Sequence, residues 1–264
     1  MSLAWSVHIS WLFGELPYLE RVGAARSAGF RCIETAWPGR AEREGLPRAV
    51  AEHGVAVALL NCSAGDAGNG ERGFVNDPSR RAEAERAFLA AAELAERIGA
   101  RNLNLLVGRS LPGVGLARQR ESVIAALRDC AAEAAARGLR VLIEPLNDTE
   151  NPGYLAPTPQ DAVALIEASA ADGLGLLLDV YHLGCAGIEP LAAIDRFAPL
   201  IGHVQVSDWP GRGEPGSGSL DVWGILERLD ASGYTGAVGL EYEPRGTTEA
   251  SFAFLRDKRA RALF

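Results

Sequence analysis

The sequence predicts a single (β/α)₈ barrel that spans residues 1–264, and three observations support this fold class. Short apolar runs alternate with helical segments, a glycine recurs where helices end, and the chain has 264 residues. Strands that alternate with amphipathic helices indicate parallel βα units. Eight such units in about 250 residues favour a closed barrel over an open doubly wound sheet.

Eight apolar runs are the predicted strands. They are WSVHIS (5–10), CIE (32–34), VALL (57–60), LNLL (103–106), VLIE (141–144), LLLD (176–179), IGHVQV (201–206) and AVGLE (237–241). Six helical segments are followed by a glycine that can adopt the left-handed conformation of a helix C-cap. These are Gly29, Gly54, Gly99, Gly138, Gly173 and Gly233.

The clearest helical patterns cover residues 81–98, 117–137 and 159–171. The third begins with Thr158, Pro159 and Asp161, which predict a side-chain cap, a proline at the first helical position and an acid in the first turn. No linker or change in composition suggests a second domain. A dinucleotide-binding fold is disfavoured, because no GxGxxG motif follows the first strand.

Composition restricts the function. The net charge is −8, which argues against a sequence-independent nucleic-acid binder. No apolar run is long enough to cross a membrane, and the N-terminus lacks a secretory pattern, so we expect a cytoplasmic protein. The four cysteines lie far apart in the sequence and form no close pair, so we expect them to be reduced thiols. Self-association of the chain stays open.

Two glycine-rich loops follow predicted strands, at residues 61–80 and 207–219. The loops that follow strands lie on the face of such a barrel that carries its active site. We therefore expect both loops to border a functional site.

Four consecutive predicted strands end in oxygen-bearing side chains, namely Glu144, Asp179, Gln205 and Glu241. Each closes a run too apolar to lie on the surface, where an unpaired carboxylate is costly. Three carboxylates and an amide that converge at the barrel mouth suit a hard divalent ion, Mg²⁺ or Mn²⁺. The alternative, in which each acid caps a helix or pairs with an arginine, is weaker for four consecutive strands than for one.

Further candidates surround these positions. His182 follows Asp179 by three residues, Arg212 lies in the second glycine-rich loop, and Glu150 lies beyond strand five. A structural role for His182 and a solvent-facing role for Arg212 stay open. We favour a core role for His203, whereas Glu34 either orients the ligands or pairs locally.

The segments GFRCIETAWP, NCSAGD, NGERGF, IEPLN, LDVYH, HVQVSDWPGRGEPGSG and GLEYEP resemble the hydroxypyruvate isomerase family, within the xylose-isomerase-like barrel superfamily. The resemblance covers nearly the whole chain. It implies one divalent metal held by Glu144, Asp179, Gln205 and Glu241, with Glu144 and Glu241 also as the acid/base pair. Related ketose 3-epimerases imply substrate-binding roles near Glu150, His182 and Arg212.

Three positions depart from the family pattern. Gly213 and Ser219 stand where a histidine and a glutamate are common, and His8 stands where relatives often have asparagine. All three lie near the substrate mouth, so they leave the exact substrate open.

The expected reaction is an aldose–ketose isomerisation, for example of hydroxypyruvate to tartronate semialdehyde, through an enediolate and without an organic cofactor. An alternative with the same residues is a 3-epimerase or isomerase of a keto-sugar or four-carbon oxo sugar acid. A non-catalytic sugar-binding protein is a third reading. An abasic-site endonuclease of the superfamily is disfavoured, because it requires three zinc ions and a set of histidines, and the chain has four histidines in all.

Overall fold

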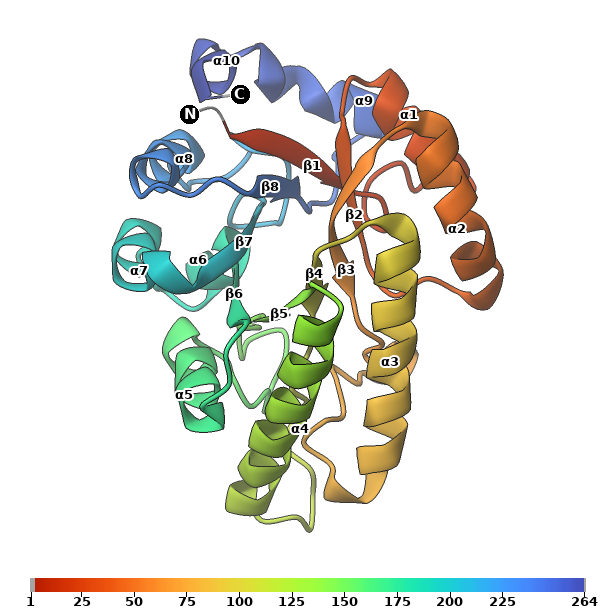
Figure 1. Ribbon diagram of the computed structural model, residues 1–264. Coiled ribbons are helices and arrows are strands. Elements are labelled where there is room, and N and C mark those ends of the chain that lie inside the picture. The colour runs from red at the N-terminus through yellow and green to blue at the C-terminus, as the bar shows by residue number, and fades with distance from the viewer. Residues whose placement is uncertain (1–2, 264) are drawn as a thin grey trace.

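The computed structural model describes residues 3–263, without the side chains of 261–263, and shows parallel strands closed into a barrel in the order β1 to β8 (Figure 1). The predicted (β/α)₈ fold class is confirmed. The strands are β1 (Ala4–His8), β2 (Cys32–Thr35), β3 (Ala56–Asn61), β4 (Asn102–Asn104), β5 (Arg140–Ile143), β6 (Leu174–Asp179), β7 (Ile201–Val206) and β8 (Ala237–Leu240).

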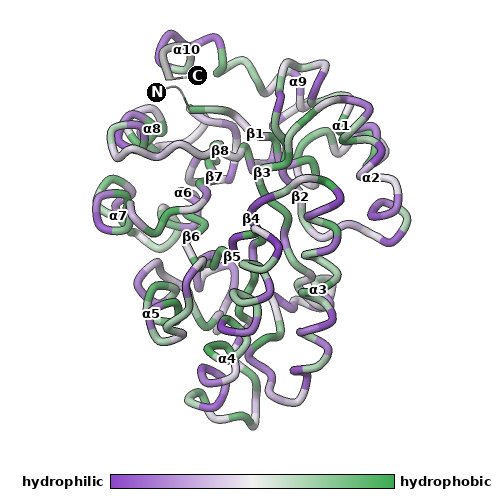
Figure 2. The backbone as a smooth tube through the Cα atoms, viewed as in Figure 1, coloured by the Kyte–Doolittle hydropathy of each residue, from purple (hydrophilic) through white to green (hydrophobic). Residues whose placement is uncertain are grey.

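Helices surround the barrel. They are α1 (Glu20–Ser27), α2 (Arg40–His53), α3 (Arg81–Ile98), α4 (Leu116–Ala136), α5 (Pro159–Ser169), α6 (Val180–Cys185), α7 (Pro190–Phe197), α8 (Val222–Ala231), α9 (Thr248–Ser251) and α10 (Lys258–Leu263). Short 3₁₀ helices are η1 (Ala67–Asn69), η2 (Pro78–Arg80), η3 (Ala198–Leu200) and η4 (Phe252–Arg256). Hydrophobic and hydrophilic stretches alternate along the outer helices, as expected for helices with one face on the barrel (Figure 2).

Two strands end two residues earlier than the sequence predicts. β1 ends at His8 rather than at residue 10, because the His8 carbonyl accepts hydrogen bonds from the amides of Trp11 and Leu12, which begin a turn. β4 ends at Asn104, although the apolar run continues beyond it. Soon afterwards Gly108 takes a left-handed backbone conformation, with φ of 103°.

Helix ends follow the predicted signals with one exception. Gly54 and Gly99 are left-handed C-caps of α2 and α3, with φ of 60° and 69°. The Thr158 hydroxyl caps α5 by accepting from the Asp161 amide, as predicted. The prediction that α5 reaches residue 171 is wrong, since the helix ends at Ser169 and Ala170 takes the left-handed conformation before Gly173.

The barrel holds its main hydrophobic core between strands and outer helices, where Val7, Leu103 and Leu178 are fully buried. Among the described residues, no helix is both long and apolar enough to cross a membrane. Loops 61–80 and 207–219 follow β3 and β7, so both open on the carboxyl-end face of the barrel.

Candidate active site

The four predicted metal ligands lie at the carboxyl ends of β5 to β8. Glu144 follows β5, Asp179 is the last residue of β6, and Glu241 follows β8. Gln205 lies in β7 and pairs in register with Asp179. All four side chains belong to buried residues, with exposed fractions between 1% and 6%. The structure therefore brings these four residues to one end of the barrel.

Two of the three carboxylates in this cluster share one arginine. Arg212 Nη2 lies 3.4 Å from Asp179 Oδ2 and 3.2 Å from Glu241 Oε2. Burial raises the pKa of Asp179 to about 7, and Glu241 adds to this rise. Burial also raises the pKa of Glu144, and the negative charges of Glu241 and Asp179 raise it further. One guanidinium thus leaves the negative charge of the cluster only partly balanced.

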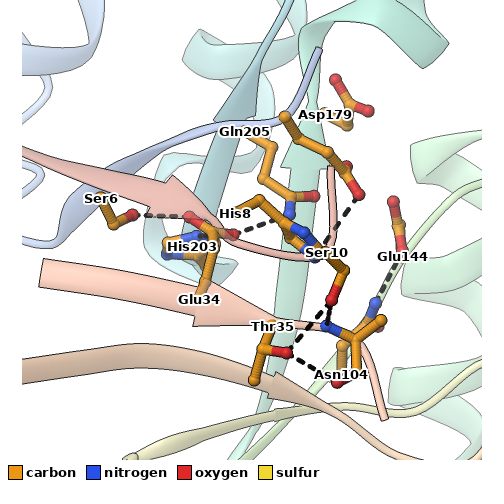
Figure 3. A network of polar contacts seen from close by, with 12 residues as sticks. Ser6, His8, Ser10, Glu34, Thr35, Asn104, Glu144, Asp179, His203 and Gln205 are labelled. Atoms are coloured by element: carbon orange, nitrogen blue, oxygen red, sulfur yellow. Dashed lines mark hydrogen bonds and ion pairs between the residues drawn. The ribbon is translucent and has the colours of Figure 1, made fainter. Parts of the chain in front are cut away.

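Gln205 is oriented by the buried side chain of Glu34. Its amide Nε2 donates to Glu34 Oε2 over 2.7 Å, so its Oε1 points away from Glu34 and has no hydrogen-bond partner among the described residues. Glu34 also accepts from Ser6 Oγ at 2.6 Å and contacts His203 Nε2 at 3.1 Å, which Figure 3 shows. Although burial opposes it, His203 and then His8 lower the pKa of Glu34 to about 2.

These contacts answer two questions that the sequence left open. Glu34 orients a predicted ligand rather than pairing only locally. His203 is buried in β7 against Glu34, which agrees with a core role. An ionised Glu34 keeps the Gln205 amide group in one of its two flip states, and this presents oxygen rather than nitrogen to the site.

His182 lies beside the carboxylates, with Nε2 at 3.9 Å from Glu144 Oε1 and 3.7 Å from Asp179 Oδ2. Its Nδ1 accepts from the Asn147 backbone amide at 3.3 Å, so the hydrogen of the neutral ring is on Nε2. Burial lowers the pKa of His182 to about 3, and Arg212 adds to this effect. The ring is therefore neutral and directs an N–H donor at the carboxylates.

Ligand atoms of Glu144, Asp179 and His182 lie within 4.8 Å of one another. This separation is compatible with a metal ion. The tautomer inferred above, however, gives Nε2 a hydrogen, and a metal ligand must offer a lone pair there. The oxygen set Glu144, Asp179, Gln205 and Glu241 fits a hard cation without a change of tautomer.

Glu150 belongs to the same polar network as His182. It accepts from Tyr181 Oη at 2.5 Å and from Asn147 Nδ2 at 3.1 Å, and Asn147 Nδ2 lies 2.6 Å from His182 Nδ1. The structure thus connects two of the three predicted substrate-binding residues through Asn147, a residue that the sequence analysis did not single out.

Arg212, the third predicted substrate-binding residue, is held between two aromatic rings. Its Cζ lies 4.3 Å from the Trp11 ring centroid and 4.9 Å from that of Tyr181. Burial alone would lower the pKa of Arg212. The negative charges of Glu241, Asp179 and Glu144 raise it by more, so the pKa is raised overall. The guanidinium is therefore charged and faces the carboxylate cluster, not the solvent.

The loop that carries Arg212 is fixed by a buried aspartate. Asp208 accepts hydrogen bonds from the backbone amides of Trp209, Gly216 and Leu220, at 2.9, 2.8 and 3.0 Å. Arg212 itself has φ of 51°, a conformation that a non-glycine residue adopts only when its surroundings impose it.

Gly213 and Ser219 have local structural roles in this loop. A Cβ at Gly213 would lie 2.5 Å from Ser217 Oγ, so a larger residue requires that side chain to move. Ser219 donates from its backbone and hydroxyl to the Trp209 carbonyl, at 2.7 and 2.9 Å.

Besides Asn147, three contributors to the site were missed from the sequence. Asn104 Nδ2 donates to Glu144 Oε2 at 2.6 Å (Figure 3). It ends β4 in the structure, but the sequence prediction extended this strand to residue 106, so the strand-end rule that selected the proposed metal ligands did not include it. Trp11 and Tyr181 gave no comparable signal, because their contact with Arg212 depends on loop paths.

The chain matches the family model described as xylose isomerase-like TIM barrel over residues 22–258. The chain belongs to this family. Over 95% of its length it is 38% identical to a Streptomyces coelicolor protein provisionally named hydroxypyruvate isomerase, with 94% of that protein covered. It is 32% identical to the hydroxypyruvate isomerase of Escherichia coli, with 96% of this chain and 98% of that protein covered.

A 2-oxo-tetronate isomerase from Haemophilus influenzae is 30% identical, with 92% of this chain and 94% of that protein covered. The resemblance predicted from the sequence motifs is confirmed by these matches over nearly the full length. The predicted enzyme class, an isomerase, is confirmed as well.

A solved structure from Brucella melitensis, described as an AP endonuclease of family 2, has a TM-score of 0.92 at 30% identity and covers 97% of this chain and 98% of its own. The four histidines occupy separate positions, and His8 Nε2 lies 3.6 Å from Glu241 Oε1. His53 ends α2, His203 contacts Glu34, and His182 is the histidine that lies with two acids in a metal-compatible group. This arrangement differs from the histidine-rich set that a three-zinc nuclease requires.

Proposed function

We propose that the protein is a metal-dependent isomerase that converts hydroxypyruvate to tartronate semialdehyde. The observation that carries the proposal is the ring of buried oxygen ligands at the ends of four consecutive strands, with Gln205 Oε1 unpartnered among the described residues. Support also comes from the relatives named hydroxypyruvate isomerase.

The residues present fit a divalent ion such as Mg²⁺ or Mn²⁺. Buried carboxylates with raised pKa values and an orphaned amide oxygen gain from a hard cation, because it offsets their repulsion and replaces their lost hydration. Glu144, Asp179, Gln205 and Glu241 would hold it. When bound, the ion would stabilise the negative charge that develops on the carbonyl oxygen of the substrate as the C3 proton leaves.

The two glutamates at the ends of β5 and β8 carry the proton transfers. One carboxylate takes the proton from C3, and the other takes the proton of the O3 hydroxyl as the aldehyde forms. The second carboxyl group then protonates C2, and the first protonates O2. The C3–H bond is broken, a C2–H bond is formed, and Glu144 and Glu241 both end ionised.

The surrounding side chains hold these carboxylates in place. Asn104 fixes Glu144, and Arg212 bridges Asp179 and Glu241. His182 offers its Nε2 hydrogen to a substrate oxygen, since burial keeps the ring neutral. These fixed donors are already in position before charge develops on the substrate.

The 2-oxo-tetronate isomerase relative supports a second candidate within the same chemistry, a four-carbon oxo sugar acid as substrate. Product analysis separates the two. EDTA-treated protein and protein supplied with Mg²⁺ or Mn²⁺ are offered hydroxypyruvate, 2-oxo-tetronate and a ketose panel. Metal-dependent conversion of hydroxypyruvate supports the proposal, whereas conversion of 2-oxo-tetronate alone replaces the substrate. Binding of substrates without any turnover favours a non-catalytic sugar-binding protein.

A further inference from the structure

Two arginines from different loops meet beside the network of Glu150. Arg72 lies in the loop after β3, and Arg109 lies in the loop after β4. Arg72 Nε donates to Asn151 Oδ1 at 3.0 Å, and Arg109 Nη2 lies 3.4 Å from the same oxygen. Arg109 Nη2 also donates to the Glu150 carbonyl at 3.2 Å. Both loops return to the starts of α3 and α4, at the lower end of Figure 1.

Neither guanidinium has a carboxylate within ion-pair distance in the part of the chain that the structure describes. The neighbouring acids are engaged elsewhere. Glu71 binds Arg80 at 2.5 Å, and the Glu150 carboxylate accepts from Tyr181 and Asn147. Arg109 Nε is buried and has no hydrogen-bond partner among the described residues. Within this part of the chain, the pair therefore carries two positive charges and a free buried donor without a counterion.

The electrostatics of the pair agree with this geometry. Burial lowers the pKa of Arg72, and the charge of Arg109 lowers it further. Two like charges held together beside an unused Nε–H donor are stabilised by an oxyanion, and the planar guanidinium matches a carboxylate in shape.

The pair is connected to the proposed active site. The Asn151 amide donates to the Asn147 carbonyl at 3.0 Å, and Asn147 contacts His182 Nδ1. Hydrogen bonds thus run from both arginines through Asn151 and Asn147 to the histidine that faces the carboxylate cluster. Arg212, by contrast, already has acidic partners in Asp179 and Glu241.

We propose that Arg72 and Arg109 form the subsite that recognises the carboxylate of an oxo-acid substrate and so distinguishes it from a neutral ketose. This inference rests on the proposed isomerisation of an oxo acid. It assigns the charge selectivity to the loops after β3 and β4, and it leaves the proton transfers to the strand ends.

The test uses two compounds that share the reacting HOCH₂–CO– unit. Hydroxypyruvate has a carboxylate where dihydroxyacetone has a neutral CH₂OH group. Dissociation constants of both compounds are measured by calorimetry on Mg²⁺-supplied protein in which E144Q blocks the proposed proton transfer, either alone or combined with R72Q, R109Q, R72K or R212Q. R120Q, at an exposed arginine of α4, is the matched control. Binding is read without turnover, and turnover of hydroxypyruvate by wild type is recorded separately as the test of the proposed function.

For R72Q and R109Q we expect hydroxypyruvate to bind about 10- to 100-fold more weakly while dihydroxyacetone binding is unchanged. R72K, which keeps the charge, should recover part of the loss, and R120Q should match E144Q alone. Equal losses for both compounds would indicate loop damage and overturn the inference. Loss of the preference in R212Q alone would overturn it as well, by assigning the carboxylate to Arg212.

Discussion

Glu34 accepts the Nε2 hydrogen of Gln205 over 2.7 Å and thereby decides which atom of the amide faces the barrel mouth. An ionised carboxylate can only accept, so the nitrogen must turn to Glu34 and the oxygen to the proposed metal site. Ser6 and His203 hold Glu34 from two sides. The proposed metal site therefore depends on a residue that is not itself one of its ligands.

The first prediction concerns this relationship. In E34Q the new side chain can offer an N–H to Gln205, so the Gln205 amide is no longer held in one state. We expect Mn²⁺ to bind about 10- to 100-fold more weakly, as for other residues that orient metal ligands. Titration calorimetry on EDTA-treated protein measures this. Unchanged affinity in a folded E34Q would show that Gln205 needs no support or binds no metal.

The second prediction concerns the stacking of Arg212 between Trp11 and Tyr181. W11L removes one ring and keeps an apolar side chain. A cation–π contact at a desolvated site contributes up to about 2 kcal/mol. We expect kcat/KM for hydroxypyruvate to fall about 10-fold in W11L with the melting temperature little changed. W209L, at a partly exposed ring of the same face, is the control and should retain activity.

The third prediction concerns pH and the metal-free protein. Burial raises the pKa of Asp179 from 3.8 in the unfolded chain to about 7 and also raises that of Glu144. Between these pH values the folded state binds more protons than the unfolded state, so the free energy of unfolding falls as pH rises from about 4 to 7. Thermal melts of EDTA-treated protein over this range should show a falling melting temperature.

Two comparisons isolate the cause of that pH dependence. The fall in melting temperature should be smaller in D179N, where one titrating group is absent. It should also be smaller with saturating Mn²⁺, because the ion favours the ionised carboxylates. The same slope in wild type and D179N would assign the pH dependence to other groups.

The barrel could be predicted from the sequence because its signals are local. Each strand is a short apolar run. Each glycine after a helix can adopt the left-handed conformation because it has no Cβ, whatever its distant neighbours are. The grouping of the four proposed ligands could be predicted for a related reason, since parallel strands of a closed barrel end on one face and place Glu144, Asp179, Gln205 and Glu241 together. The same rule did not select Asn104, because the apolar run extends to residue 106 whereas β4 ends at Asn104.

Other parts of the site could not be predicted from local patterns. Trp11 and Arg212 meet only because a turn after β1 and a loop after β7 converge. The tautomer of His182 depends on a backbone amide of Asn147 in another loop. The predicted end of α5 at residue 171 was also wrong. Ala170 takes the left-handed backbone conformation, which its side chain disfavours and which the sequence analysis assigned to Gly173.

The most direct test of the proposed isomerisation follows the hydrogen that is transferred to C2 of the substrate. Proton NMR in D₂O monitors hydroxypyruvate with wild type, E144Q and E241Q, each with Mg²⁺ or with EDTA. The proposed transfers deliver to C2 the exchangeable hydrogen of the O3 hydroxyl, so wild type with metal should give tartronate semialdehyde fully deuterated at C2. Each variant should lose about 10²- to 10⁴-fold in rate, and EDTA should abolish turnover. Retention of protium at C2, or full activity in either variant or in EDTA, would contradict the account.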